Sequence, residues 1–140
     1  MFRREVLIEW GDCDPAGIVF YPRYFAMFDA STAGLFSAAL GCTKFEMLAR
    51  YGIIGIPMVD TGAKFLIPSK FGDVIAIETE VTEFRRSSFN ISHKVFRGAE
   101  VAITAHETRV WAGRHPDDPS RITGVAIPEE VKDRLFAMKP

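Results

Sequence analysis

Cysteine is scarce in this 140-residue sequence. Only Cys13 and Cys42 occur, and their separation matches neither a metal-binding nor a thioredoxin-like pair. A disulfide framework is therefore excluded, and reduced thiols in a reducing compartment are expected. The N-terminal segment also lacks an apolar signal sequence with a small-residue cleavage site. The sequence therefore predicts a cytoplasmic protein.

An excess of either charge is missing as well. The chain has 17 Lys and Arg residues against 18 Asp and Glu residues, for a formal net charge of -1. This balance gives no general attraction to nucleic acid or to an anionic membrane surface, and neither partner is predicted. Any anionic ligand must be bound by a local group of basic side chains.

One segment, residues 21–41, has few charges and is nearly as long as a membrane span. Arg23 and Asp29 are its only charged residues, and Asp29 lies in the middle. A carboxylate at that depth of a bilayer would be costly, so we expect a helix covered on nearly every side by other parts of the protein. Pro22 suits its first position and Gly41 its C-terminal exit.

Several motifs of cofactor and metal enzymes are absent. There is no zinc-binding pair of histidines on a helix, no Gly-x-Ser-x-Gly elbow, no P-loop and no dinucleotide fingerprint. A calcium loop over Asp12, Asp14 and Gly17 fails because Arg23 occupies the position of the bidentate glutamate. No metal and no organic cofactor are predicted.

Length and a hydrophobic content of 48% predict one soluble globular domain over residues 1–140. Turn signals separate β-rich segments with period-two alternation, clearest over residues 88–96. We expect an N-terminal strand, the long helix, a short helix at 44–50, and a last helix from Pro128. The other expected strands cover 57–67, 73–84, 88–96, 101–111 and 121–126. This order fits an α+β domain in which antiparallel strands wrap one long helix.

The segment from Gly11 to Pro22 places two carboxylates in a turn just before the long helix. Unpaired N–H groups at a helix start can polarise an electron-rich atom, and a nearby carboxylate could attack what they polarise. The arrangement indicates an acyl-transfer site. On turn chemistry alone, Asp12 and Asp14 are better explained as turn residues, since Asp before Pro favours a local side-chain bond.

The same segment resembles the signature of the 4-hydroxybenzoyl-CoA thioesterases of the hot-dog-fold superfamily. The similarity continues through Tyr24, Asp29, residues 52–59, residues 72–79 and residues 83–89, and covers nearly the whole chain. It implies a hot-dog fold with a long central helix wrapped by a five- to six-stranded antiparallel sheet. Weaker similarity extends to the Tol-Pal-associated acyl-CoA thioesterases and the dihydroxynaphthoyl-CoA enzymes.

The resemblance implies an acyl-CoA thioesterase that needs no cofactor. Asp14 corresponds to the family's essential carboxylate, which attacks the thioester carbonyl or activates water against it. The backbone N–H of Tyr21 corresponds to the donor that polarises the thioester oxygen, as a helix N-terminus would. Asp12 is expected to support the turn.

Arg85 and Arg86 correspond to basic residues that bind CoA phosphates in the family, and guanidinium groups suit phosphate oxygens. The alternative is a solvated turn. The family has a lysine where this chain has Ser87, so Lys70 or Arg50 are further candidates for CoA binding.

The acyl group is expected to contact Tyr24, Asp29 and Ile56. Asp29, expected to be buried in its apolar helix, would bind a substrate hydroxyl or orient the site, or else be a structural carboxylate paired in an interface. Ile56 replaces a threonine of the family, which could change ring preference. Benzoyl, hydroxybenzoyl and phenylacetyl thioesters are therefore all candidates, with short aliphatic and dihydroxynaphthoyl esters behind them.

The resemblance also implies a homodimer or homotetramer with sites between subunits. A non-catalytic acyl-CoA or acyl-carrier binding module is the rival from another class. A dehydratase would need a histidine base, but His93 lies on the apolar face of its strand and is expected to be a hydrogen-bonded core residue.

Overall fold

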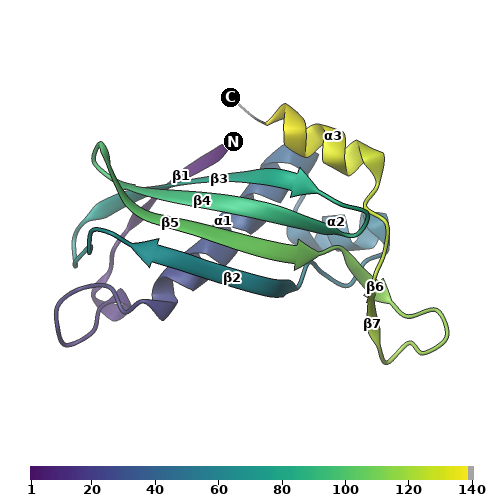
Figure 1. Ribbon diagram of the computed structural model, residues 1–140, viewed down its shortest axis with the longest axis horizontal. Coiled ribbons are helices and arrows are strands. Elements are labelled where there is room, and N and C mark those ends of the chain that lie inside the picture. The colour runs from purple at the N-terminus through teal and green to yellow at the C-terminus, as the bar shows by residue number, and fades with distance from the viewer. Residues whose placement is uncertain (139–140) are drawn as a thin grey trace.

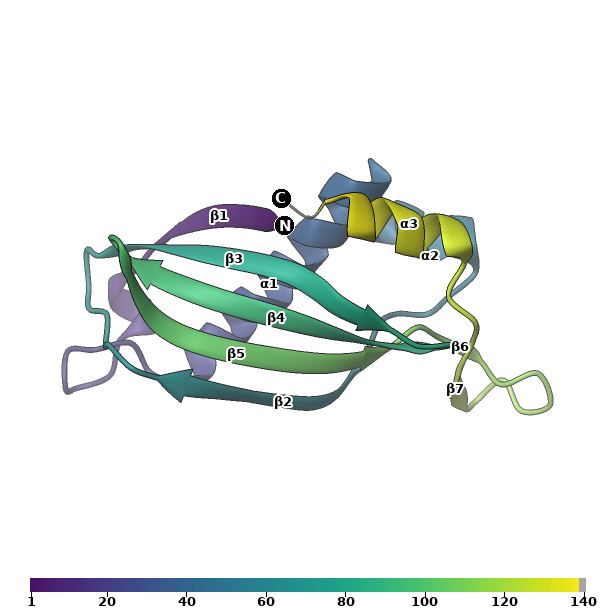
Figure 2. The same ribbon diagram turned by 45° about the horizontal axis from the view of Figure 1, so that its top comes forward.

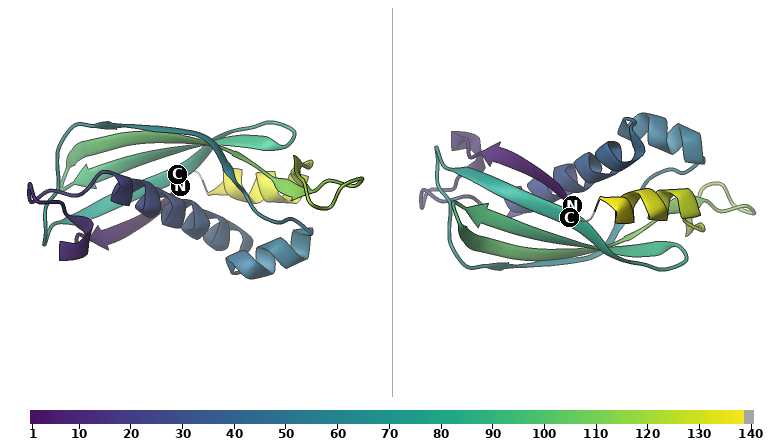
Figure 3. Two further views of the ribbon diagram at one scale, coloured as in Figure 1. Left: turned by 90° about the horizontal axis from the view of Figure 1, so that it is seen from below. Right: turned by 90° about the horizontal axis from the view of Figure 1, so that it is seen from above.

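In a computed structural model that describes residues 1–138, the long helix α1 (Pro22–Leu40) lies against one face of a five-stranded sheet (Figure 1). Views along the sheet show the strands curving around one side of α1 (Figure 3). The predicted arrangement of a long helix and an antiparallel sheet is confirmed.

The sheet has the order β1-β3-β4-β5-β2, and every neighbouring pair is antiparallel. A tight turn at Gly98 joins β4 to β5, with Gly98 at φ 62°. β2 forms one edge of the sheet. The strands are β1 (Phe2–Leu7), β2 (Met58–Phe65), β3 (Val74–Phe84), β4 (Ser88–Arg97) and β5 (Glu100–Val110).

The strand expected at residues 121–126 is shorter than predicted and does not join this sheet. It is β7 (Ile122–Gly124), which pairs with β6 (Ala112–Arg114) in a separate two-stranded ribbon. β5 ends at Val110, one residue before the predicted end, although the Trp111 N–H still donates to the Ser87 carbonyl at 2.7 Å. The Ala112 N–H then donates to the Gly55 carbonyl at 3.1 Å.

Local signals set the ends of the helices. Pro22 is the first residue of α1, and Gly41 ends it in the left-handed conformation at φ 66°. Thr43 caps α2 (Lys44–Tyr51) by accepting a hydrogen bond from the Glu46 N–H at 3.2 Å. α3 (Glu129–Ala137) packs beside the end of β3 and against α1 (Figure 2).

The expectation that α1 is covered on nearly every side is wrong for the single chain. Tyr24, Phe28 and Leu35 on one face are buried, whereas Ala26 and Ala30 on the other are exposed. The exposed positions of α1 hold small alanines together with the charged Arg23 and Asp29. Within residues 1–138, no single helix is long and apolar enough to span a membrane; α1 and α2 meet that criterion only as a pair bent by 62°.

Two apolar clusters form the core, and a layer of polar side chains separates them. One cluster surrounds Leu35, Phe36 and Trp111, and the other surrounds Phe28 and Ile77. The residues of α1, β3, β4 and β5 that lie between the two clusters along each element are buried and polar or charged: Ser31, Thr32, Thr79, His93, Glu107 and Arg109.

Candidate active site

The turn that carries the two predicted carboxylates is a small hairpin. Cys13 bridges Val19, and the Gly17 N–H donates to the Asp14 carbonyl at 2.9 Å, with Gly17 at φ 82°. Asp12 Oδ2 accepts the Glu9 N–H at 2.9 Å. That bond fits the supporting role expected of Asp12.

Asp14 itself is half-buried, and one of its two oxygens is occupied. Oδ1 accepts the Ala16 N–H at 2.8 Å, which is the local bond typical of Asp in a turn. Oδ2 has no hydrogen-bond partner among the residues that the structure describes. The turn interpretation and the catalytic interpretation are therefore compatible, because the bond to Ala16 fixes the carboxylate and leaves one oxygen free.

The start of α1 leaves one backbone donor unused. Pro22 has no N–H, the Arg23 N–H donates to the Phe20 carbonyl at 2.9 Å, and the Tyr24 N–H donates to the Tyr21 carbonyl at 3.1 Å. The Tyr21 N–H has no acceptor within residues 1–138. It is the donor that the resemblance implies, at the positive end of the helix dipole.

Tyr21 and Tyr24 line a cavity of about 200 Å³ beside this turn. The hydroxyls of Tyr24 and Ser69 are buried in its wall, and Ser69 is the polar neighbour of the Tyr24 hydroxyl. Burial raises the pKa of Tyr24, so its phenol stays protonated and can donate. The lining residues are Ile18, Val19, Tyr21, Tyr24, Phe65, Ile67, Pro68 and Ser69.

Asp29 and Ile56 line a second cavity, of about 380 Å³, near the middle of α1. The prediction of a buried Asp29 is wrong: its side chain is 55% exposed and pairs with Arg109 Nη2 at 2.9 Å. Asp29 lies at the edge of the buried face of α1, where it reaches Arg109 of β5 and keeps its charge in contact with solvent. The other lining residues are Lys44, Ile54, Gly55, Pro57, Met58, Arg109 and Ile122.

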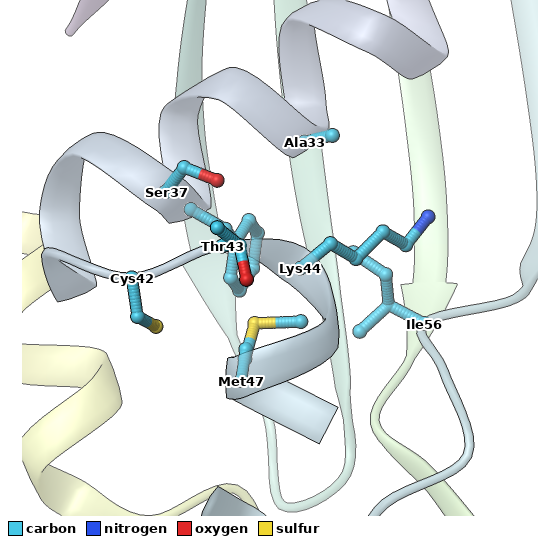
Figure 4. A pocket seen from close by; sticks show the side chains of 8 residues that line it. Ala33, Ser37, Cys42, Thr43, Lys44, Met47 and Ile56 are labelled. Carbon is cyan, nitrogen blue, oxygen red and sulfur yellow. The ribbon is translucent and has the colours of Figure 1, made fainter. Parts of the chain in front are cut away.

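A much smaller pocket, of about 10 Å³, shares Lys44 and Ile56 with this cavity (Figure 4). In the close-up the Met47 and Cys42 side chains lie below Thr43. Space of this size holds about one water molecule. The larger cavity is therefore the one of the two that can accept an acyl group.

Arg109, which lines the second cavity, and its buried partner Glu107 were not predicted. Arg109 is 3% exposed and Glu107 is 1% exposed, and they pair at 2.6 Å between Arg109 Nε and Glu107 Oε2. Burial opposes charge on Glu107, yet hydrogen bonds from His93 and Arg109 outweigh it and lower the Glu107 pKa. The same pairing, with Asp29, outweighs burial of Arg109 and raises its pKa. His93 is the hydrogen-bonded core residue that the sequence predicts.

The predicted CoA-binding arginines lie in the turn between β3 and β4, at the opposite end of the sheet from the Asp14 turn (Figure 1). Arg85 is engaged locally with Glu83, Ser88 and Asn90 at 2.7–2.8 Å. Arg86 is exposed, and its guanidinium has no partner in the described residues.

The other basic candidates are divided between the two ends. Lys70 bridges Ile18 through its backbone and so lies next to the Asp14 turn. Arg50 Nη1 donates to the Leu40 carbonyl at 3.4 Å. Ser87, where the family has lysine, packs against Gly124, since a Cβ on that glycine would lie 2.8 Å from Ser87 Oγ.

Within residues 1–138, no group of three or more metal-binding side chains comes together. His106, which the sequence leaves without a role, is exposed on β5 and pairs with Asp60 at 3.2 Å.

Comparison with known proteins identifies the family. The model of the thioesterase-like superfamily matches residues 8–135. The chain belongs to that superfamily. Its relatives include the 4-hydroxybenzoyl-CoA thioesterase of Pseudomonas sp. strain CBS-3, which is 36% identical over 128 residues, 88% of this chain and 89% of the relative.

Solved structures of thioesterases share the hot-dog fold of the chain. A 4-hydroxybenzoyl-CoA thioesterase variant in complex with 4-hydroxybenzoyl-CoA superposes with a TM-score of 0.86 at 32% identity, over 95% of this chain and 96% of that one. A gentisyl-coenzyme A thioesterase gives 0.81 at 28% identity, over 95% and 98%. The family, the fold and the prediction of a thioester hydrolase are confirmed.

Proposed function

We propose that this thioesterase hydrolyses an aromatic acyl-CoA, 4-hydroxybenzoyl-CoA or a related hydroxybenzoyl or benzoyl ester, to the free acid and CoA. One observation supports the proposal most directly. Asp14 has one oxygen held by Ala16 and one oxygen free, on the turn that leads into α1, where the Tyr21 N–H has no acceptor. A nucleophile or base and an electrophilic donor thus lie at the two ends of one short loop.

The chemistry needs little more than this pair. The Tyr21 N–H binds the thioester oxygen and stabilises the negative charge that develops on it. The free oxygen of Asp14 attacks the carbonyl carbon, or removes a proton from a water that attacks it. The tetrahedral intermediate collapses and CoA leaves as a thiolate. Where Asp14 itself has attacked, water then hydrolyses the resulting anhydride, which releases the acid and restores the Asp14 carboxylate.

The acyl group is assigned to the cavity of Asp29 and Ile56. Its volume of about 380 Å³ accommodates a substituted aromatic ring, and its wall combines the apolar Ile54, Ile56 and Met58 with a carboxylate. The free oxygen of Asp29 can accept a hydrogen bond from a ring hydroxyl. Ile56 offers no hydroxyl there, so the position of the ring substituent is left to Asp29.

A homodimer or homotetramer with shared sites is part of the proposal. The Asp14 turn and Arg86 lie at opposite ends of one chain, and Tyr21 and Asp29 are separated by eight residues, about 12 Å along α1. The exposed small-residue face of α1 and the free edge of β2 offer a surface for a second copy. A cytoplasmic location and a role in aromatic degradation are proposed with it.

Thiol release from a panel of acyl-CoAs tests the function. The panel contains 4-hydroxybenzoyl, 3-hydroxybenzoyl, benzoyl, phenylacetyl, dihydroxynaphthoyl and short aliphatic esters. We expect the hydroxybenzoyl esters to give the highest kcat/KM. Binding of these esters without thiol release would contradict the proposal and indicate a binding module, and a preference for aliphatic esters would contradict the aromatic assignment.

Labelled solvent oxygen separates the two roles of Asp14. In a single turnover in H₂¹⁸O, direct attack through an anhydride leaves label in the Asp14 carboxylate when water attacks the aspartyl carbon. Activation of water leaves the label only in the released acid. Mass spectrometry of the peptide that contains Asp14 distinguishes them.

A further inference from the structure

We propose that Arg109 is a positioning residue of the acyl cavity, held by Glu107 and His93, and that it fixes the Asp29 carboxylate so that one oxygen is presented to a ring hydroxyl of the substrate. The inference rests on the proposed assignment of the acyl group to this cavity. Three contacts of one buried guanidinium support it.

Arg109 joins the two walls of the cavity. Its Nη2 donates to Asp29 Oδ1 on α1 at 2.9 Å, and its Nη1 donates to the Ile56 carbonyl, in the segment before β2, at 3.1 Å. Its Nε donates to Glu107 Oε2 at 2.6 Å. All three nitrogens are used, so the plane of the guanidinium is fixed in three directions.

Glu107 is held just as firmly. Its Oε2 also accepts the Thr32 hydroxyl at 3.0 Å, and its Oε1 lies 2.9 Å from His93 Nε2. His93 Nδ1 lies 2.8 Å from the Thr79 hydroxyl. With the proton of a neutral imidazole on Nε2, His93 donates to Glu107 and accepts from Thr79, so each buried side chain of this network has a partner.

The network has one exposed end within the described part of the chain, and that end is Asp29. Thr79, His93, Glu107 and Arg109 are each no more than 3% exposed, whereas the Asp29 side chain is 55% exposed and lines the cavity. Oδ2 of Asp29 has no partner in residues 1–138. The oxygen that Arg109 leaves free is thus the acceptor available to a ligand.

Stability alone does not account for this arrangement. A charged layer between two apolar clusters incurs a desolvation cost that well-packed apolar side chains would avoid. A fixed carboxylate, in contrast, improves discrimination between substrates, because a substrate hydroxyl must reach one position to be bound. The desolvation cost of the charged layer in the core is therefore accompanied by better discrimination between substrates at the cavity.

Substrate discrimination tests the positioning role. The readout is the ratio of kcat/KM for 4-hydroxybenzoyl-CoA to that for benzoyl-CoA, which differ only in the hydroxyl. We expect the wild-type enzyme to favour the hydroxylated ester, and Arg109→Lys, which keeps the charge but loses the planar fork, to reduce the ratio by about tenfold or more. A general structural defect would lower both rates and leave the ratio unchanged, and that result would overturn the proposal.

Two further comparisons make the test specific. Arg114→Lys, on the exposed ribbon, is the matched control and should keep the ratio. Asp29→Asn should lower the ratio as Arg109→Lys does, and the double variant should lower it no further, because both changes remove the same held carboxylate. Additive losses in the double variant would overturn the proposal.

Because Asp29 is exposed, its variants are expected to fold. They therefore test the proposal even if Arg109→Lys does not fold. Asp29→Glu keeps the charge but moves the oxygen, and it should lose most of the preference. Retention of the preference would show that position is unimportant and would overturn the inference.

Binding of the free acids separates this inference from the proposed function. Calorimetry with 4-hydroxybenzoate and benzoate measures the same preference without turnover. If no ester is cleaved but the wild-type enzyme prefers 4-hydroxybenzoate and Arg109→Lys does not, the proposed function fails and the positioning role stands. If the wild-type enzyme has no preference, the positioning role fails.

Discussion

Asp14 and Asp29 show the same arrangement in two settings. Each carboxylate has Oδ1 bound to the protein, to the Ala16 N–H in one and to the Arg109 guanidinium in the other. Each has a second oxygen without a partner in residues 1–138. A carboxylate fixed in this way loses little freedom when it meets a substrate.

Substitution of the two neighbouring arginines at the β3–β4 turn should change KM to different extents. Arg86→Ala should raise KM for CoA esters by about tenfold or more, because a charge-assisted bond to phosphate is lost. Arg85→Ala should change KM less, because Arg85 is already bound to Glu83, Ser88 and Asn90. The measurement is KM for an acyl-CoA.

A thioester of N-acetylcysteamine, which lacks the nucleotide, is the control substrate for these variants. Its KM should be unchanged by Arg86→Ala. An equal rise in KM for both substrates would contradict the assignment of Arg86 to a CoA phosphate.

At the scale of the elements, β5 connects the core to the cavity. Alternation along this strand places Ile103, Ala105, Glu107 and Arg109 on one face, and the first two belong to the apolar core. Two charged residues that continue the apolar face of a strand indicate a buried ion pair. Glu107 and Arg109 carry this signal in the sequence, as His93 carries that of a buried polar residue. Their partner Asp29 was not identifiable from spacing, because 80 positions separate it from Arg109.

The pairing of Glu107 predicts a stability that depends on pH. Its pKa in the folded protein is lowered from the ordinary value of 4.5, so the unfolded chain binds more protons as the solution is acidified. The contribution of Glu107 to stability is therefore complete above pH 4.5 and is lost as the pH falls through the folded-state pKa.

Glu107→Gln isolates this contribution. Near neutral pH the variant should lose about 3 kcal/mol of unfolding free energy, because Arg109 loses a buried partner. The difference from wild type should shrink as the pH falls below 4.5. Urea unfolding at several pH values measures it, with exposed Glu83→Gln as the control; a difference that does not change with pH would refute the assignment.

Most elements were predictable because their signals are local. Pro22 and Gly41 mark the ends of α1, and period-two alternation marks β4. The exposure of Asp29 and the separate β6–β7 ribbon were not predictable, since both depend on contacts between distant segments. Asp29 pairs with Arg109, and the Ala112 N–H at the start of β6 donates to the Gly55 carbonyl. The Asp14 turn was located from sequence, and its geometry matches the role proposed for it.

For the whole molecule, the separation of the Asp14 turn from Arg86 predicts shared sites. If Asp14 of one subunit works with Arg86 of another, mixing Asp14→Asn with Arg86→Ala chains restores one intact site in each mixed dimer. About a quarter of the wild-type activity is then expected at acyl-CoA concentrations below KM. Thiol release by co-expressed chains measures this; activity equal to the average of the two variants would show that each chain works alone.

The most direct test of the account is thiol release from 4-hydroxybenzoyl-CoA by Asp14→Asn beside Asp12→Asn. Both variants replace a carboxylate by an amide in the same turn, and Asp12→Asn keeps an oxygen for the Glu9 N–H. The account predicts that Asp14→Asn lowers kcat by about 10²-fold to 10⁴-fold while Asp12→Asn stays within a few-fold of wild type. Full activity in Asp14→Asn, or equal losses in both variants, would contradict it.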